Sequence, residues 1–138
     1  MAVDRKGYWT YRSSDGFEIL VGRTAQENDE LTFHVAAQED IWLHVAPTPG
    51  SHVVVRNPDH LQRLPRTTLD EAAALAAWYS KCRTAGRVAV HWCRRKDVRK
   101  ERGSPAGQVM LEKYDQVKVR PAIPPGVTAV DAPPADSL

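Results

Sequence analysis

The most informative alternation of apolar and polar residues runs from residue 40 to residue 45, as in a half-buried strand. Because successive side chains of a strand point to opposite faces, this segment has one apolar and one mixed face. The apolar face comprises Ile41, Leu43 and Val45, and the mixed face comprises Asp40, Trp42 and His44. A carboxylate and two ring N–H groups need hydrogen-bonding partners, so we expect the mixed face to be left uncovered for a ligand.

A turn and a returning strand follow this segment. Residues 46–50 hold two prolines and Gly50, a composition that favours a turn. Residues 51–56 are again β-rich, so the pattern predicts an antiparallel hairpin. The return brings Ser51 and His52 near the mixed face, but the pattern leaves open which of them points toward it, because that depends on the register.

Other β-rich runs predict the remaining strands. Residues 8–11 and 17–21 flank a polar connection that ends in glycine and predict a hairpin. Residues 88–93 alternate as a further strand, and residues 108–112 and 116–120 predict a last hairpin. Strands joined by such short connections pair antiparallel, so we expect a mostly antiparallel sheet.

One long helix is expected over about residues 68–84. Thr68 and Glu71 have the spacing of a capping box, in which each side chain bonds the backbone N–H of the other residue. The following residues are rich in alanine and carry an apolar stripe that suits packing on a sheet. Gly86 lies just past the apolar pattern and is typical of a helix end.

A short helix is expected over about residues 28–36, with Asn28 as its cap, although residues 31–35 also alternate like a strand. The fold class is therefore α+β, a mostly antiparallel sheet with one long and one short helix. We expect a single domain over residues 1–121 and a flexible proline-rich tail over residues 122–138.

The net charge is only +2, so the distribution of charge along the chain is more informative than its total. Residues 1–60 hold five basic and nine acidic side chains, whereas residues 61–120 hold fourteen and six. Residues 94–102 are the most basic stretch, with six cations and two acids. Such asymmetry favours a polyanionic partner, and the alternative is a solvated strand edge that prevents aggregation.

The cysteines and the apolar runs indicate in which cellular compartment the protein is expected. Two cysteines are too few for a disulfide framework, which favours a reducing compartment. No apolar run reaches the length of a membrane span, and residues 1–6 are not followed by a signal-peptide core. We therefore expect a cytoplasmic protein that does not associate with membranes.

Metal and cofactor sites are not expected. The eligible metal ligands lack the short spacings of structural zinc sites; they are His34, His44, His52, His60, His91, Cys82 and Cys93. The sequence also lacks the glycine-rich fingerprints of phosphate-binding loops and dinucleotide sites.

A small metal-independent hydrolase or nuclease is one alternative function. It would use Ser51 as nucleophile, His44 or His52 as base, and Asp40 to orient the base. The residues around Ser51 do not resemble the Gly-x-Ser-x-Gly turn, so we expect no enzyme. Another alternative is a protein interaction module whose tail docks a partner.

Nucleic-acid binding is the remaining hypothesis. The basic stretch would neutralise phosphates, Arg23 and Arg56 would contribute from strand ends, and Trp42 or a histidine ring would stack on an unpaired base. The opposing interpretation is that Trp42 lies in the core beneath a loop and that the basic stretch is merely solvated. The residues by themselves leave both interpretations open.

Several motifs in this order resemble the NFACT-R domain. They are Gly16-Phe17-Glu18-Ile19-Leu20-Val21-Gly22-Arg23, Glu27-Asn28-Asp29-x-Leu31-Thr32, Asp40-Ile41-Trp42-Leu43-His44-Val45 with Pro49-Gly50-Ser51-His52-Val53, and Leu69-Asp70-Glu71-Ala72-Ala73 with Tyr79-Ser80-Lys81. The third of these blocks is highly specific, and the similarity runs from about Tyr8 to Pro121.

The resemblance implies an RNA-binding role without an established catalytic activity. NFACT proteins of the RqcH and NEMF types act in ribosome-associated quality control, where they bind an obstructed large ribosomal subunit and hold tRNA. We therefore expect a stand-alone NFACT-R protein whose partner is ribosomal or transfer RNA, and the sequence does not define its oligomeric state. Family positions predict a binding surface of Arg23, Asp40, Trp42, His44, Gly50, Ser51 and His52, and charge adds Arg94, Arg95, Lys96, Arg99 and Lys100.

Overall fold

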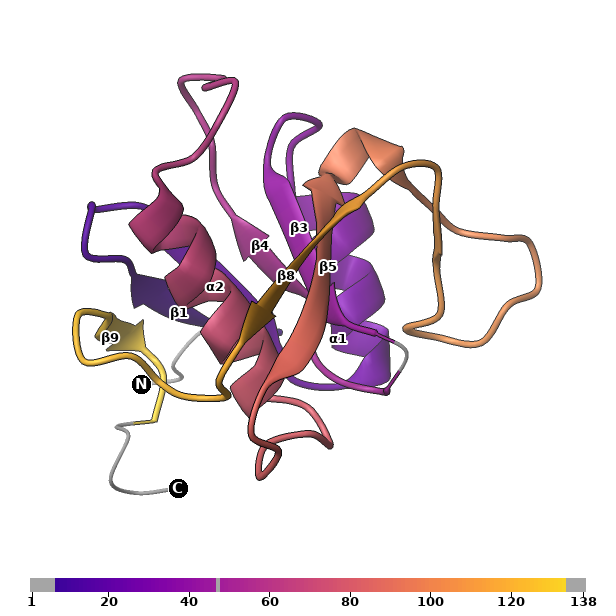
Figure 1. Cartoon of the computed structure of the whole chain (residues 1–138). Helices are drawn as coiled ribbons and strands as arrows, with labels where there is room; N and C mark the ends of the chain where they lie inside the picture. Colours follow the sequence, from indigo (N-terminus) through magenta and orange to yellow (C-terminus); the bar gives the residue numbers. More distant parts are fainter. Residues whose placement is uncertain (1–6, 47, 134–138) are drawn as a thin grey trace, which may run out of the picture.

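The computed structural model describes residues 7–46 and 48–133, and its centre is a seven-stranded antiparallel sheet (Figure 1). The strands are β1 (Tyr8–Arg12), β2 (Glu18–Gly22), β3 (Ile41–Val45), β4 (Val53–Val55), β5 (Val88–Arg94), β8 (Asp115–Val119) and β9 (Thr128–Asp131). Their order across the sheet is β8-β5-β3-β4-β2-β1-β9. Residues 1–6, Pro47 of the expected turn and the last part of the expected tail lie outside the described residues.

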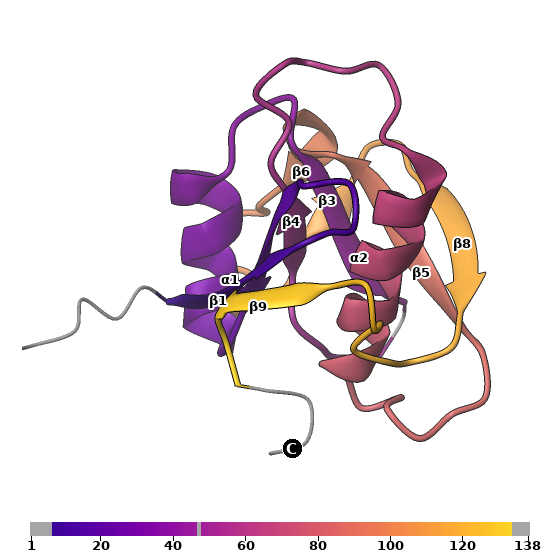
Figure 2. The same ribbon diagram turned by 90° about the vertical axis from the view of Figure 1, so that its left-hand side faces the viewer.

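Helices lie on both sides of this sheet (Figure 2). The elements outside it are α1 (Ala25–Glu30) with a π-helical turn (Leu31–Val35), α2 (Arg66–Trp78), a 3₁₀ turn (Arg95–Asp97) and a small two-stranded sheet of β6 (Val98–Arg99) and β7 (Met110–Leu111). Within residues 7–46 and 48–133, no helix is long and apolar enough to cross a membrane.

The face beneath α2 holds the larger core. Leu43 of β3 and Val53 of β4 are completely buried there, together with Ala72 and Ala76 of α2. Alanine projects only a methyl group, so the helix can lie close to the strands and fill the space between them without voids. The expected apolar face of β3 is therefore a core face.

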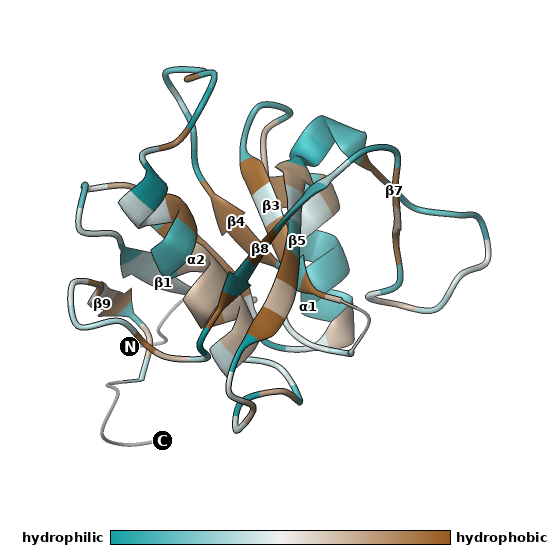
Figure 3. Ribbon diagram, in the orientation of Figure 1, coloured by the Kyte–Doolittle hydropathy of each residue, from teal (hydrophilic) through white to brown (hydrophobic). Residues whose placement is uncertain are grey.

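The opposite face is also apolar over the middle of the sheet. Trp42 of β3 and Val54 of β4 pack there with Leu31 of the π-helical turn and Val98 of β6. Figure 3 shows the hydrophobic stretches of β3, β4 and β5 near the centre and hydrophilic loops around them. Two layers therefore enclose the central strands.

This second layer does not reach across the whole sheet. On the same face of the neighbouring strands, His91 of β5 is half-buried, and Gln116 and Lys118 of β8 are exposed. The β5–β8 side of the sheet is thus open to solvent on the face that carries α1.

The α+β class and the mostly antiparallel sheet are confirmed. The first expected hairpin corresponds to β1 and β2, which pair from Tyr8 opposite Gly22 to Arg12 opposite Glu18. The central hairpin corresponds to β3 and β4, which pair from Ile41 opposite Val55.

The bounds and the capping of the long helix differ from the prediction. It runs from Arg66 to Trp78 rather than over 68–84, and Pro65 is its N-cap without a side-chain bond. Thr68 and Glu71 instead bond residues of the β1–β2 turn, because that turn packs against the first part of α2. The helix ends early because the next residues bond the turn after β3, so Gly86 does not end it.

The short helix is present, and the strand alternative for residues 31–35 is wrong. It begins at Ala25, earlier than expected, because Thr24 caps it by accepting a bond from the Glu27 N–H at 3.1 Å. Asn28, the expected cap, is instead buried within the helix. Its side-chain oxygen accepts a hydrogen bond from the backbone N–H of His52, just before β4.

The C-terminal pairing also differs from the prediction. β7 pairs with β6, and β8 pairs with β5, so residues 108–112 and 116–120 do not form a hairpin with each other. The segment expected to be a flexible tail contains β9, which pairs with β1. Both differences arise because strands distant in sequence offer free edges that local patterns do not reveal.

Candidate nucleic-acid interface

The mixed face of β3 is covered rather than open to a ligand. Trp42 and His52 are each only 1% exposed. The covering elements are α1 with its π-helical turn and the loop before β7, not the long helix α2. His52 does point toward Trp42, with their ring centroids 5.0 Å apart, which resolves the register that the sequence left open. Direct stacking of Trp42 on an RNA base is therefore not supported.

A chain of hydrogen bonds satisfies these buried rings. The Trp42 Nε1–H donates to Thr32 Oγ1 at 3.1 Å, and Thr32 Oγ1 lies 2.8 Å from His52 Nδ1. The Gly107 carbonyl can only accept, so His52 carries its proton on Nε2 and donates to it at 3.0 Å. Nδ1 of the neutral ring is then an acceptor, and it receives the proton of the Thr32 hydroxyl.

The two histidines of this region are uncharged at neutral pH. Burial, together with the neighbouring His44, lowers the pKa of His52 to about 4. Burial likewise lowers the pKa of His44 to about 4, although a hydrogen bond to the Gly50 backbone acts in the opposite direction. Neither ring can therefore act as a cation toward phosphate near pH 7.

Asp40 has a structural part in the fold. It is 1% exposed, and its carboxylate accepts from the Asn57 N–H at 2.7 Å and the Ala37 N–H at 2.9 Å. Arg56 lies 3.1 Å from the same carboxylate. These partners use both oxygens of Asp40, and both ring nitrogens of His52 are bonded elsewhere. Asp40 therefore does not orient His52, one of the two bases that the hydrolase alternative offers.

A cleft of about 610 Å³ opens beside the covered row. It brings together segments far apart in the sequence; its lining residues are Arg23, Thr24, Ala25, Asn28, His44, Pro49, Gly50, Ser51, Tyr79, Ser80, Lys81, Ala106, Gly107 and Gln108. Among the described residues, the lining includes two cations, hydroxyls and amides but no carboxylate. This composition suits an anionic ligand.

Four of the residues predicted from the family pattern line this cleft. Arg23 forms a two-bond contact with Glu27, at 3.0 and 3.1 Å, and lies over the Trp9 ring. His44, Gly50 and Ser51 form part of the opposite wall. The structure thus brings these four residues to one cleft, which includes His44 of the mixed face but not Asp40 or Trp42.

The sequence prediction missed the other walls. Lys81 is exposed at the cleft, and its backbone N–H donates to the Pro49 carbonyl at 3.3 Å. Gln108 comes from the loop that Gly107 anchors on His52. In the sequence, the Tyr79-Ser80-Lys81 motif was the only signal for the wall that carries Lys81. No local pattern indicates that the loop with Gln108 lies near the cleft.

The basic stretch is largely engaged inside the protein. Arg94 donates to the carbonyls of Glu39, Leu61 and Gln62. Arg95 bonds the Thr32 carbonyl and lies over Phe33, and burial lowers the pKa of its guanidinium. Both arginines therefore hold the 3₁₀ turn on the body of the protein.

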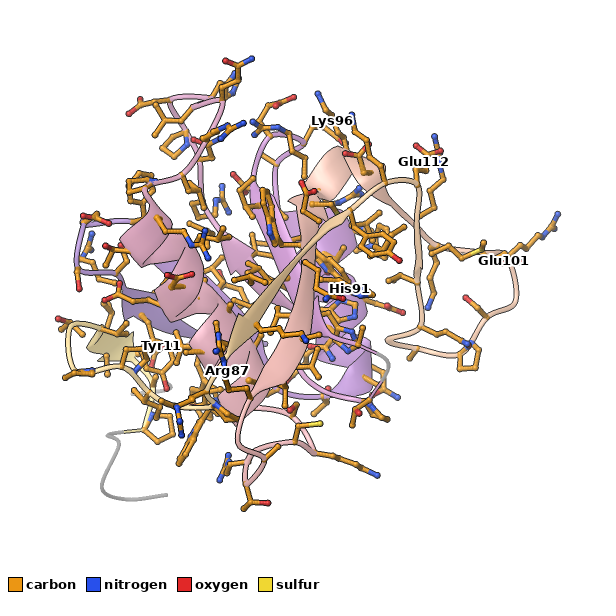
Figure 4. All side chains as sticks on the ribbon, viewed as in Figure 1. Tyr11, Arg87, His91, Lys96, Glu101 and Glu112 are labelled. Atoms are coloured by element: carbon orange, nitrogen blue, oxygen red, sulfur yellow. The ribbon has the colours of Figure 1, made fainter. Side chains whose placement is uncertain are left out.

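Three of the other four cations of this stretch have acidic partners, and the fourth, Arg102, is exposed. The Lys96, Arg99 and Lys100 side chains lie 2.9 Å from Glu39, 2.6 Å from Glu112 and 3.0 Å from Asp29, respectively. Figure 4 shows Lys96 beyond one end of β5 and Arg87 near the other end, with His91 between them. The cations thus do not form one free basic patch.

Comparison with known proteins identifies the family to which this chain belongs. Residues 6–113 match the model described as the NFACT protein RNA binding domain. The chain belongs to the NFACT RNA-binding domain family. The match includes all the residues that line the cleft, whereas β8 and β9 lie beyond it.

Relatives of the family are much longer than this chain. The chain is 39% identical over 112 residues to the Rqc2 homolog RqcH of Bacillus subtilis, covering 81% of this chain and 19% of that protein. It is 29% identical over 126 residues to ribosome quality control complex subunit 2 of Saccharomyces cerevisiae, covering 83% and 12%. The chain thus spans about a fifth or less of these curated relatives.

A solved structure has the same fold as this chain. It is the C-terminal part of the fibronectin/fibrinogen-binding protein from Streptococcus suis, with a TM-score of 0.79 and 32% identity. The match covers 88% of this chain and 48% of the other chain.

Proposed function

We propose that this NFACT-R chain binds ribosomal or transfer RNA in the cytoplasm, as part of ribosome-associated quality control. One relative is named ribosome quality control complex subunit 2, and another is named an Rqc2 homolog. The matching family model is described as an RNA-binding domain. The proposal concerns binding by this domain, because the chain spans only a fraction of the relatives' length.

The observation that carries the proposal is the cleft without carboxylates. Lys81 supplies positive charge at its walls, Arg23 adds a guanidinium whose charge Glu27 partly balances, and hydroxyl and amide groups between them can donate to phosphate oxygens. Neutralising phosphates releases counterions from RNA, which supplies most of the affinity for a nucleic-acid backbone. We infer that the RNA backbone lies in this cleft.

The predicted site residues then have different roles in the proposal. Arg23, His44, Gly50 and Ser51 face the RNA, and Lys96, Arg99 and Lys100 contribute charge from the flank. Of the remaining members, His52, with Trp42 packed beside it, supports the lining because it bonds Asn28 and Gly107. The others bond residues that do not line the cleft: Asp40, Arg94 and Arg95.

Fluorescence anisotropy with labelled ribosomal RNA fragments and tRNA, measured over a salt series, tests this proposal. We expect Lys81→Ala to weaken binding and to reduce the log–log salt slope by about 0.7 to 0.9, the contribution of one phosphate contact. Adding Arg23→Ala should reduce the slope again by a similar amount.

Arg12→Ala is the matched control. Arg12 is exposed on β1, contacts the Gly16 carbonyl and does not line the cleft, so its removal should leave the slope unchanged. Equal slopes for the wild type and the Arg23/Lys81 double variant would rule out the cleft as the binding site.

A further inference from the structure

The face of the sheet that carries α1 continues from the cleft to the edge strand β8. His44, which lines the cleft, pairs with His91 of β5, and His91 pairs with Gln116 of β8. These three side chains form one row across three strands, and it spans two strand spacings, about 10 Å. The outer part of the row is not covered, since His91 is half-buried and Gln116 is exposed.

An exposed aromatic side chain stands at the outer end of this row. Tyr114 is 52% exposed and immediately precedes β8. Its ring stacks on His91 with the centroids 4.2 Å apart and the planes inclined by 27°. Contact with the imidazole orients the ring and leaves the remainder of it to solvent, so Tyr114 can offer a π-face without losing much side-chain entropy on binding.

Two cations lie farther along this face of the sheet, toward the far end of β8 from Tyr114. Lys118 pairs with Ala89 on the same face as Gln116, and Arg87 donates to the Lys118 carbonyl at 3.2 Å. Both cations are exposed. Carboxylates also occur near Tyr114, since Asp97 and Asp115 line a pocket with it. Glu112 is bound to Arg99, and Asp115 itself pairs with Trp92, whose side chain packs on the α2 face.

We propose that the Tyr114–His91 pair is a stacking platform for an unpaired RNA base, with Lys118 and Arg87 contacting the phosphates beside it. Aromatic side chains bordered by cations are the usual means of holding single-stranded RNA, because every base has a π-face and every linkage a negative charge. The proposal rests on the RNA-binding function above and extends its path from the cleft across β5 to β8.

A protein partner would need a different surface. Protein interfaces centre on apolar patches with few charges, whereas Tyr114 has Gln116 and Lys118 on the same face. A single aromatic ring among polar and cationic groups favours a base over an apolar side chain. The platform would therefore distinguish single-stranded from double-stranded RNA, because bases in a duplex are already stacked.

The test compares a labelled single-stranded RNA of about 12 nucleotides with a duplex of the same sequence, using the full chain and fluorescence anisotropy. We expect Tyr114→Ala to weaken binding to the single strand about tenfold, equivalent to about 1.4 kcal/mol, and to change duplex binding by less than about twofold. Tyr114→Phe keeps the ring and should retain wild-type affinity.

Val130→Ala is the control for loss of an exposed apolar side chain. Val130 is 55% exposed on β9, at the other end of the sheet, so this variant should bind both probes like the wild type. Equal single-strand affinity for the wild type and Tyr114→Ala, or equal losses in the Ala and Phe variants, would overturn the platform alone. Failure of the wild type to bind any RNA would overturn the proposed function as well.

Discussion

At the scale of single residues, one threonine connects the buried rings beside the cleft. Thr32 is completely buried, accepts from Trp42 and donates to His52, so a single hydroxyl satisfies two ring nitrogens. A buried polar group without a partner costs more free energy than a made hydrogen bond contributes. The packing of the row therefore depends on Thr32, which belongs to a family motif but was not among the predicted site residues.

Replacing Thr32 with valine should lower the free energy of unfolding by about 2 to 6 kcal/mol. Valine has nearly the same shape, but the change leaves the Trp42 N–H and His52 Nδ1 buried without a partner, each at about 1 to 3 kcal/mol. Urea denaturation followed by circular dichroism measures the difference. Thr67→Val, at an exposed position of α2, should change stability by less than about 0.5 kcal/mol. Equal losses in both variants would contradict this account.

At the scale of elements, the cleft depends on a close approach between the turn after β3 and the residues after α2. Gly50 forms a bridge with Ser80, and the Ser51 N–H donates to the Tyr79 carbonyl at 3.0 Å. A Cβ on Gly50 would lie 2.7 Å from the Ser80 Cβ, which no side-chain rotation relieves. Position 50 of the central motif thus requires glycine, because the segment after α2 lies so close to it.

Gly50→Ala should separate the two walls of the cleft and weaken RNA binding about tenfold, with a smaller loss of stability. Anisotropy with the tRNA probe and urea denaturation measure the two effects. Gly86→Ala is the matched control, because a Cβ there has open space around it and should leave binding unchanged. Binding by Gly50→Ala at wild-type affinity would show that the approach of the two walls is not needed.

At the scale of the whole molecule, the covering of both sheet faces makes stability depend on pH. His52 and His44 have pKa values of about 4 in the folded protein, against 6.5 for the ordinary side chain. Between these values the unfolded chain binds protons that the folded chain does not, so folding is favoured at higher pH. The stability is fully present above pH 6.5 and is lost as the pH falls toward 4.

We expect His44→Gln to reduce the slope of unfolding free energy against pH by about 1.4 kcal/mol per pH unit between pH 6 and 4.5, the effect of one proton. Urea denaturation at several pH values measures it, and carboxylates titrating in this range affect all variants alike. His34→Gln, at an exposed position, should retain the wild-type slope. A wild-type slope in His44→Gln would show that His44 is protonated equally in both states.

Much of the fold was predictable because its signals are local. The alternation over β3 and the turn composition after it identified the central hairpin, and the central motif identified the family. The cleft was only partly predictable. Arg23, Gly50, Ser51 and Lys81 all belong to the family motifs, but Gln108 does not, and the approach of the segments that carry Lys81 and Gln108 depends on tertiary contacts.

The sequence by itself determined the two-faced strand, the α+β class and the family, because side-chain period and turn chemistry act between near neighbours in the chain. Only the tertiary structure decided what covers the mixed face, which edges the C-terminal strands join, and whether the cations are free. Those outcomes depend on contacts between distant residues, such as the bond from His52 to Gly107, 55 residues away. Local patterns show that a buried ring needs a partner, but the partner itself is set by how the chain packs.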